Sequence, residues 1–251
     1  MGQRDDLRAT AVTAVEGLTG LKMSPNKIKD YEKAITNQWY LDYNESFYGD
    51  REYPWLALTF WVDWSFENAR RAIKFMDSID YVPKKIIDLG AGIGLSTAQM
   101  ALKYPSAEVV YQNIPSLQER VAKRIFDRHG LSNITYSNNF ENDADVVLGF
   151  EVFEHLHEPV DAARVSLKNT NLYFDSSSFG FPSPGHWPTY LVDGDKEVDG
   201  KRMKRFFYKQ LRLMGFDYAH DLDLMAKPFW NSRPAVFVRT SWLEYMVFHA
   251  L

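Results

Sequence analysis

The chain has 251 residues, of which 45% are hydrophobic and 25% are charged, so it is long enough for one large globular domain with an appendage. A formal net charge of -4 provides no general basic field, which argues against nucleic acid as a partner. The chain has no cysteine, which excludes a disulfide framework, a thiolate zinc site and a cysteine nucleophile and suits a cytoplasmic protein.

Residues 1–80 are predicted to form a helical, aromatic-rich extension. Helices are expected over 5–19, 25–36 and 65–78. Between them, residues 37–64 carry ten aromatic side chains, which form either a buried seam that fastens the extension or an aromatic wall over a substrate pocket. The extension would then be a lid or an interface. The start lacks a signal-peptide core, and the longest strongly apolar run, 55–62, is far too short to span a bilayer, so we expect no membrane association.

Residues 81–251 are predicted to form a second domain in which strands and helices alternate. Strands are expected over 85–89, 107–112, 133–136, 145–149, 171–175, 216–222 and 234–239, and helices over 94–103, 116–129, 157–166 and 201–214. This order predicts parallel strands with right-handed crossovers. The fold class is therefore α/β, a doubly wound, mostly parallel seven-stranded sheet whose ligands bind at the carboxyl ends of the strands.

A glycine-rich turn follows the strand 85–89. Its glycines permit a sharp turn and a close ligand, and the start of the next helix favours an anionic group. The dinucleotide fingerprint would need a glycine where Leu95 stands. The run 88–94, Asp-Leu-Gly-Ala-Gly-Ile-Gly, instead resembles the first motif of class I S-adenosylmethionine-dependent methyltransferases. The resemblance implies that Gly90, Ala91, Gly92 and Gly94 lie against the methionine part of the cofactor, and that Asp88 holds the turn and the cofactor's amino end.

The end of the second strand departs from this family's pattern. An acidic residue normally binds both ribose hydroxyls there, but this chain has Asn113, followed by Ile114. Asparagine accepts one such bond and carries no charge. A charged hydrogen bond contributes about 1.5 to 3 kcal/mol and a neutral one about 1, so the affinity for the cofactor could fall nearly tenfold relative to an acid. We assign Asn113 and Ile114 to the cofactor site. Two alternatives are that Asn113 only caps the strand while Gln112 or another group holds the ribose, and that the fold has a different ligand or has lost catalysis.

A second motif follows the strand 145–149. The run 151–156, Glu-Val-Phe-Glu-His-Leu, is very similar to that of the ubiquinone-biosynthesis type of O-methyltransferase. Its position places Phe150 and Glu151 near the cofactor's sulfonium end, with Glu154 and His155 available for proton transfer. Alternatively, Glu154 and His155 cap the next helix or bond the loop backbone. A metal at His155 and His157 lacks a clear third ligand, so no metal is expected.

Two loops complete the predicted site. The resemblance places Asn138 or Asn139 at the edge of the adenine and Phe140 on its ring, although the same loop also reads as an ordinary polar turn. The stretch 176–200 is too long for a simple connection, and we place the acceptor beneath it. His186, Trp187 and Tyr190 either contact the acceptor or only pin this loop. The basic run 201–205 is either a solvated helix start or a site for an anionic group of the acceptor.

These features predict an S-adenosylmethionine-dependent methyltransferase that moves a methyl group to an oxygen or nitrogen of a small-molecule acceptor. The expected catalytic residues are Glu151, His155 and His186. The cofactor is expected to be S-adenosyl-L-methionine, and a homodimer is plausible. One alternative is a non-catalytic nucleotide-binding or scaffold protein on the same fold, motivated by Asn113 and by the missing Pro-Gly-Gly turn at 168–171. The other is an enzyme that uses this cofactor for a different reaction.

Overall fold

The computed structural model describes most of the predicted α/β domain and two helices before it. The described residues are 2–20, 30, 33, 62–141, 143–181, 183, 185–219 and 235–242. Apart from residues 30 and 33, the predicted helix 25–36 lies outside the described residues, as does the aromatic stretch up to residue 61. The alternative roles of that stretch therefore stay predictions.

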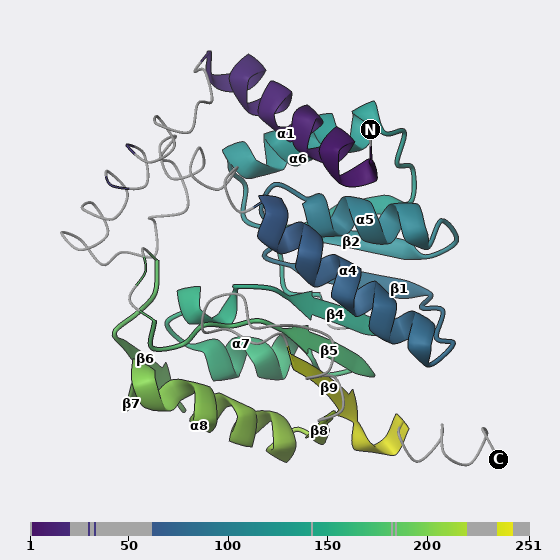
Figure 1. Cartoon of the computed structure of the whole chain (residues 1–251). Helices are drawn as coiled ribbons and strands as arrows, with labels where there is room; N and C mark the ends of the chain where they lie inside the picture. Colours follow the sequence, from purple (N-terminus) through teal and green to yellow (C-terminus); the bar gives the residue numbers. More distant parts are fainter. Residues whose placement is uncertain are drawn as a thin grey trace.

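Within the described residues, seven strands form one sheet in the order β3-β2-β1-β4-β5-β9-β8 (Figure 1). The strands are β1 (Lys85–Leu89), β2 (Glu108–Gln112), β3 (Ile134–Ser137), β4 (Val146–Gly149), β5 (Leu172–Asp175), β8 (Phe216–Tyr218) and β9 (Ala235–Arg239). Strands β1 to β5 pair with one another in parallel, and β9 runs antiparallel to both β5 and β8. The predicted seven-stranded, mostly parallel sheet is confirmed.

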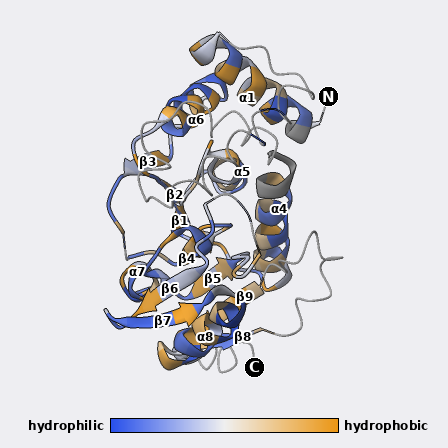
Figure 2. Ribbon diagram, turned by 90° about the vertical axis from the view of Figure 1, so that its left-hand side faces the viewer, coloured by the Kyte–Doolittle hydropathy of each residue, from blue (hydrophilic) through white to orange (hydrophobic). Residues whose placement is uncertain are grey.

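Helices cover both faces of this sheet (Figure 2). They are α1 (Gln3–Thr19), α4 (Val62–Ser78), α5 (Leu95–Lys103), α6 (Leu117–Arg128), α7 (Pro159–Ser166) and α8 (Gly200–Leu213). Alternation along the strands explains the two layers, since successive side chains point to opposite faces. Ile86 packs in one core with Ala72 and Met76 of α4, whereas its neighbour Ile87 belongs to a second core on the other face.

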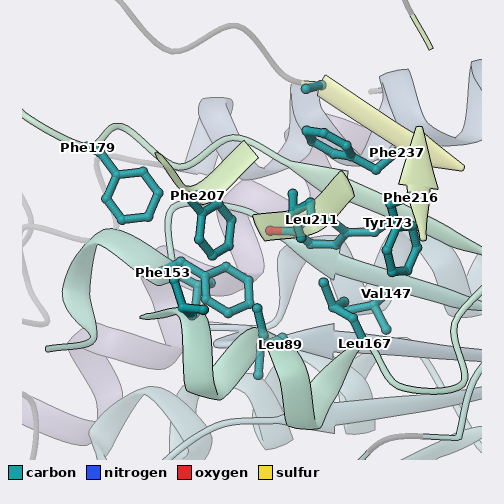
Figure 3. Close-up of a cluster of buried hydrophobic side chains, with 14 of the residues drawn as sticks. Leu89, Val147, Phe153, Leu167, Tyr173, Phe179, Phe207, Leu211, Phe216 and Phe237 are labelled. Atoms are coloured by element: carbon teal, nitrogen blue, oxygen red, sulfur yellow. The ribbon is translucent and has the colours of Figure 1, made fainter. Parts of the chain in front are cut away.

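The second core joins the sheet to α7 and α8. Figure 3 shows its aromatic centre, in which Phe153, Phe179 and Phe207 lie together beside Tyr173 and Phe237. The rings of Phe153 and Phe207 have centroids 5.1 Å apart. This packing fixes the segments that follow β4 and β5, which carry the predicted catalytic residues.

The two described helices of the predicted extension pack onto the rest of the protein. Leu7 and Ala11 of α1 share a third core with Val121 and Ile125 of α6, and α4 lies beside α5 (Figure 1). The predicted boundary near residue 80 stays a prediction.

A short β-hairpin interrupts the long loop after β5. It consists of β6 (Thr189–Val192) and β7 (Lys196–Asp199), which pair antiparallel, with Val192 opposite Lys196. Asp193 and Gly194 in its turn have φ of 53° and 87°. Such positive values are typical of Asp-Gly hairpin turns, so the sequence carried a hairpin signal within the stretch 176–200, where we predicted no strand.

Candidate functional site

The glycine turn after β1 lies against two other segments of the predicted site. Gly90 has φ of 60°, and a Cβ there would lie 2.7 Å from Cγ2 of Val152. Gly94 has φ of 78°, and a Cβ there would lie 2.5 Å from Cζ of Phe126 on α6. At Gly92, by contrast, the nearest atom to such a Cβ within the described structure is Nε2 of Gln118, at 3.8 Å. The turn is therefore packed at both ends and open at its middle, where a ligand can approach.

Asp88 fastens the turn from beneath. Its Oδ2 accepts hydrogen bonds from Ser96 Oγ at 2.6 Å and from Thr97 Oγ1 at 2.5 Å, so it ties β1 to the first turn of α5. Only 1% of the residue is exposed. Burial raises the pKa of the Asp88 carboxyl to about 6, against the opposing effect of the hydroxyls. The structure thus agrees with a role in holding the turn, and a contact with the cofactor's amino end stays a prediction.

Asn113 also turns toward the glycine turn. Its Nδ2 donates to Tyr111 Oη and to Gln118 Oε1, each at 3.0 Å, and to the Gly92 carbonyl at 3.4 Å. The Tyr111 hydroxyl donates to the same carbonyl at 2.7 Å. A carboxylate at residue 113 could not donate hydrogen bonds to the Gly92 carbonyl, Tyr111 Oη and Gln118 Oε1. These bonds give a structural reason for an amide where an acid was expected. These bonds use only Nδ2, so Oδ1 of Asn113 could accept a hydrogen bond from a ligand.

The alternative ribose ligand, Gln112, is less accessible than Asn113. It is 4% exposed, and its Oε1 accepts the N–H of Glu141 at 3.1 Å. Gln112 therefore ties β2 to the loop after β3.

The segments predicted to hold the adenine follow two paired strand ends. Gln112 of β2 lies opposite Ser137 of β3, so Ile114 and Phe140 emerge at the same edge of the sheet. Ile114 is 43% exposed and Phe140 is 44% exposed. Asn139 is exposed, and its N–H is bonded to Ser137 Oγ at 3.3 Å. Exposed apolar side chains at a carboxyl edge suit a planar base.

The segment after β4 brings two carboxyl groups to one serine. Half-buried Phe150 leads into Glu151, which has an unusual φ of 55° and donates its N–H to Ser176 Oγ at 3.1 Å. Ser178 Oγ lies 2.7 Å from Glu151 Oε2 and 3.1 Å from Glu154 Oε1, and the Ser178 N–H donates to the same Glu154 oxygen at 3.0 Å. Backbone strain at a non-glycine residue is a feature of functional sites, and it occurs here at the residue predicted to face the sulfonium.

Two histidines meet beside Glu154. Residues Phe153–His155 form a 3-10 helix, and the His155 ring lies 4.6 Å from the ring of His186, between centroids. Nδ1 of His186 lies 2.8 Å from the Phe181 carbonyl. Burial and the nearby His155 lower the pKa of His186 to about 4. Burial opposes ionisation of Glu154, but His155, His186 and hydrogen bonds that include the Ser178 N–H act in the other direction, and the pKa of this carboxyl is lowered.

The predicted catalytic residues Glu151, His155 and His186 are thus brought together, although they come from two loops. His157 takes no part in this group and lies against Trp187, with ring centroids 4.5 Å apart. Trp187 Nε1 donates to the His155 carbonyl at 3.1 Å, and buried Tyr190 donates to the Glu154 carbonyl at 3.0 Å. Of the two roles considered for Trp187 and Tyr190, these bonds support that of pinning the loop.

Sequence reasoning missed two polar residues of α4. Asn68 is buried and donates to Ser176 Oγ at 3.3 Å, and Arg71 donates from Nε to Glu67 at 3.2 Å. Asn68 Oδ1 and Arg71 Nη1 are buried without a hydrogen-bond partner in the described structure. At spacing i, i+3 they lie on one side of the helix. The signal in the sequence was an asparagine and an arginine on the helix face that carries Ala72 and Phe75.

A small pocket opens at Ser178, the residue that bonds Glu151 and Glu154. It has a volume of about 120 Å³ and is lined by Ser178, Phe179, Gly180, Phe181 and Lys204. Lys204 belongs to the basic run at the start of α8, where Asp199 caps the Lys201 N–H at 2.9 Å. The pocket thus combines an apolar wall with one cationic side chain.

Comparison with known proteins finds similarity in structure but not in sequence. No family model matches the chain, and no curated protein matches it. The structure of an O-methyltransferase family protein from Burkholderia thailandensis has a TM-score of 0.50 and 12% identity, with 85% of this chain and 71% of that chain covered. The N-terminal domain of EvdMO1, solved in the presence of SAH and D-fucose, and the methyltransferase domain of bacterial CtHen1 have TM-scores of 0.48 and 0.47. Their identities are 16% and 20%, and they cover 69% and 68% of this chain and 82% and 97% of their own.

The likeness to the Burkholderia protein, together with the strand order, shows that the described residues have a class I methyltransferase fold. Its switch point lies where β1 separates β2 from β4, and ligands of such sheets bind there. No helix in the described part of the chain is long and apolar enough to cross a membrane.

Proposed function

We propose that the protein transfers a methyl group from S-adenosylmethionine to an oxygen or nitrogen of a small molecule. The observation that carries the proposal is the glycine turn at the switch point of the sheet. Gly90, Gly92 and Gly94 all have positive φ, and Asp88 holds the helix that follows. This combination presents open backbone where a cofactor's polar tail can approach closely.

The buried polar atoms of α4 suit the amino-acid end of that cofactor. The methionine part carries a carboxylate and an ammonium group, which need a donor and an acceptor respectively. Arg71 Nη1 is an unpartnered donor in the described structure, and Asn68 Oδ1 is an unpartnered acceptor. Because leaving such groups unpaired costs about 1 to 3 kcal/mol each, a zwitterionic ligand is a physical reason for their presence.

The adenosine would follow the edge formed by the ends of β2 and β3. The Asn113 oxygen would accept one ribose hydroxyl, and the exposed faces of Ile114 and Phe140 would enclose the base. Without a carboxylate, ribose binding should be weaker than in relatives that have an acid there.

The methyl group would then point toward Glu151 and the pair of histidines. The acceptor's lone pair attacks the methyl carbon, the C–S bond breaks with its electron pair passing to sulfur, and S-adenosylhomocysteine leaves. The acceptor proton passes to a base, for which His155 and His186 are the candidates. Alignment of the acceptor should contribute more than any single base.

The acceptor would enter at the pocket lined by Phe179, Phe181 and Lys204. Lys204 favours an acceptor with a negatively charged or strongly polar group. The run 151–156 further supports the ubiquinone-biosynthesis type of O-methyltransferase as the nearest subgroup in chemistry, and hence a hydroxyl acceptor.

Calorimetry with S-adenosylmethionine and S-adenosylhomocysteine tests the proposal. We expect one site per chain for both ligands, and mass spectrometry of reactions with hydroxylated aromatic acids should detect a product heavier by one methylene. No binding at millimolar ligand would favour the non-catalytic scaffold. Binding with turnover of the cofactor but without a methylated product would favour the third alternative, a different reaction of the same cofactor.

A further inference from the structure

Three metal-ligating side chains converge next to the proposed methyl-transfer site. The carboxylate of Glu154 and the rings of His155 and His186 each offer one ligand atom, and these atoms all lie within 4.8 Å of one another. Ligand atoms on a tetrahedral zinc ion stand about 3.3 to 3.6 Å apart, given bond lengths near 2.0 to 2.2 Å. Side-chain rotations that move each atom by about 1 Å would therefore close the three onto one ion.

Glu154 has a buried carboxylate oxygen that is suited to a cation. The residue is 0% exposed, and its Oε1 is occupied by the N–H and hydroxyl of Ser178. Its second oxygen, Oε2, is buried and has no hydrogen-bond partner in the described structure. Buried carboxylate oxygens are normally paired with a donor or a metal, so this oxygen identifies a place for a positive charge.

The backbone contact of His186 assigns its Nδ1 as a donor and so leaves Nε2 as the possible metal ligand. A backbone carbonyl can only accept, so the contact of 2.8 Å between Phe181 O and His186 Nδ1 places the ring hydrogen on Nδ1. The lone pair is then on Nε2. Metal-binding histidines usually have this support, in which the second nitrogen donates to a carbonyl or carboxylate.

The local charge also favours a cation. Ser178 Oγ lies 2.7 Å from Glu151 Oε2 and 3.1 Å from Glu154 Oε1, so the two carboxyl groups approach the same hydroxyl. A hydroxyl carries one proton and can donate to only one of them. Two carboxyl groups and two imidazoles therefore lie close together at this point.

We propose that Glu154, His155 and His186 bind one divalent transition-metal ion beside the methyl-transfer site. Two imidazoles and one carboxylate favour Zn²⁺, Fe²⁺ or Co²⁺ over Mg²⁺ and Ca²⁺. Three protein ligands leave a coordination position open, as in catalytic rather than structural sites. The expectation from sequence, that no metal binds, considered only His155 with His157 as ligands, although His186 was also among the expected catalytic residues; the loop after β5 carries His186 to this group.

The metal site has a consequence that rests on the proposed function. An ion with an open position would bind an acceptor hydroxyl, lower its pKa and hold its oxygen toward the methyl group. His155 and His186 would then be ligands, so the released proton would pass to Glu151 or to solvent instead of to either imidazole. The acceptor class would then be molecules with a metal-binding hydroxyl, such as those with a second oxygen on the neighbouring carbon.

Spectroscopic titration of the chelator-treated full chain with Co²⁺ tests the metal site without reference to turnover. We expect one equivalent of Co²⁺ to give visible d–d bands with a dissociation constant below about 10 μM, and Zn²⁺ to displace it. His186→Ala and Glu154→Gln should each weaken Co²⁺ binding at least tenfold. His157→Gln is the matched control, because this histidine neighbours the group but contacts Trp187, and it should change the affinity less than twofold.

Circular dichroism should verify that each variant is folded, and His155→Gln provides a third test if one of the others is not. The proposal fails if the wild-type chain binds neither Co²⁺ nor Zn²⁺ at 1 mM, if binding survives both ligand substitutions, or if His157→Gln weakens it as much as His186→Ala. S-adenosylhomocysteine binding is measured on the same samples. Loss of the metal proposal with that binding intact would leave the proposed methyltransferase function standing.

Discussion

Replacing Asp88 by asparagine should stabilise the protein increasingly as the pH rises. The folded-state pKa of this fully buried carboxyl is raised to about 6 from 3.8, so its neutral form is the one that the fold prefers. The resulting contribution to the free energy of unfolding is fully present below the unfolded-state pKa and is lost as the pH rises through the folded-state pKa. Asparagine resembles the neutral carboxyl in shape, keeps an acceptor for Ser96 and Thr97, and does not titrate.

The magnitude follows from the two pKa values. Ionising Asp88 opposes folding by about 1.6 kcal/mol at pH 5 and about 3 kcal/mol at pH 7.5. The free energy of unfolding of Asp88→Asn, minus that of the wild type, should therefore increase by about 1.4 kcal/mol between these two pH values. Any fixed difference between an amide and a neutral carboxyl cancels in this comparison.

Urea unfolding followed by tryptophan fluorescence measures this difference. Asp77→Asn is the control, because this carboxyl is exposed on α4 and paired with Lys103 at 2.9 Å, and its effect should stay below about 1 kcal/mol. The reasoning is refuted if the advantage of Asp88→Asn is the same at both pH values or decreases with pH. A decrease would mean that the hydroxyls stabilise the anion more than burial destabilises it.

Three further predictions concern the turn and the cofactor. Gly94→Ala should lower the free energy of unfolding by about 2 to 5 kcal/mol, because its Cβ would meet the Phe126 ring in a left-handed conformation; an unchanged midpoint in urea would contradict this packing. Asn113→Ala should lower it by about 1 to 2 kcal/mol without any ligand, since three acceptors lose their shared donor, and should weaken S-adenosylhomocysteine in calorimetry about fivefold. A fully stable variant would show that the amide has no structural role. Arg71→Lys should weaken the same ligand at least about fivefold, whereas Arg70→Ala, which removes the neighbouring exposed arginine, should change the affinity less than twofold; equal effects would exclude Arg71 from the site.

The glycine turn and its flanking strands could be predicted closely because their signals are local. Apolar runs define β1 and β4, and Gly90, Gly92 and Gly94, which all have positive φ, mark the sharp turn between β1 and α5. The helix α5 begins at Leu95, one residue later than predicted, because Gly94 is left-handed and precedes it.

The remaining features depend on contacts between distant segments. His186 was expected at the same site as His155, but its local sequence does not indicate that the two ring centroids lie 4.6 Å apart. The inward turn of Asn113 depends on Gln118 and Tyr111, and the role of Asn68 depends on Ser176, 108 residues away. The β6–β7 hairpin is different. Its Asp193-Gly194 turn is a local hairpin signal, which we overlooked when we predicted a long loop over 176–200.

A crystal structure grown with S-adenosylhomocysteine tests the central claim most directly, that the crevice at the ends of β1, β2 and β4 receives this nucleoside. We predict the amino-acid tail against residues 90–94 with its carboxylate toward Arg71, the ribose at the Asn113 oxygen, and the sulfur facing Glu151. A ligand bound elsewhere, or a crevice filled by protein side chains at saturating ligand, would contradict the account.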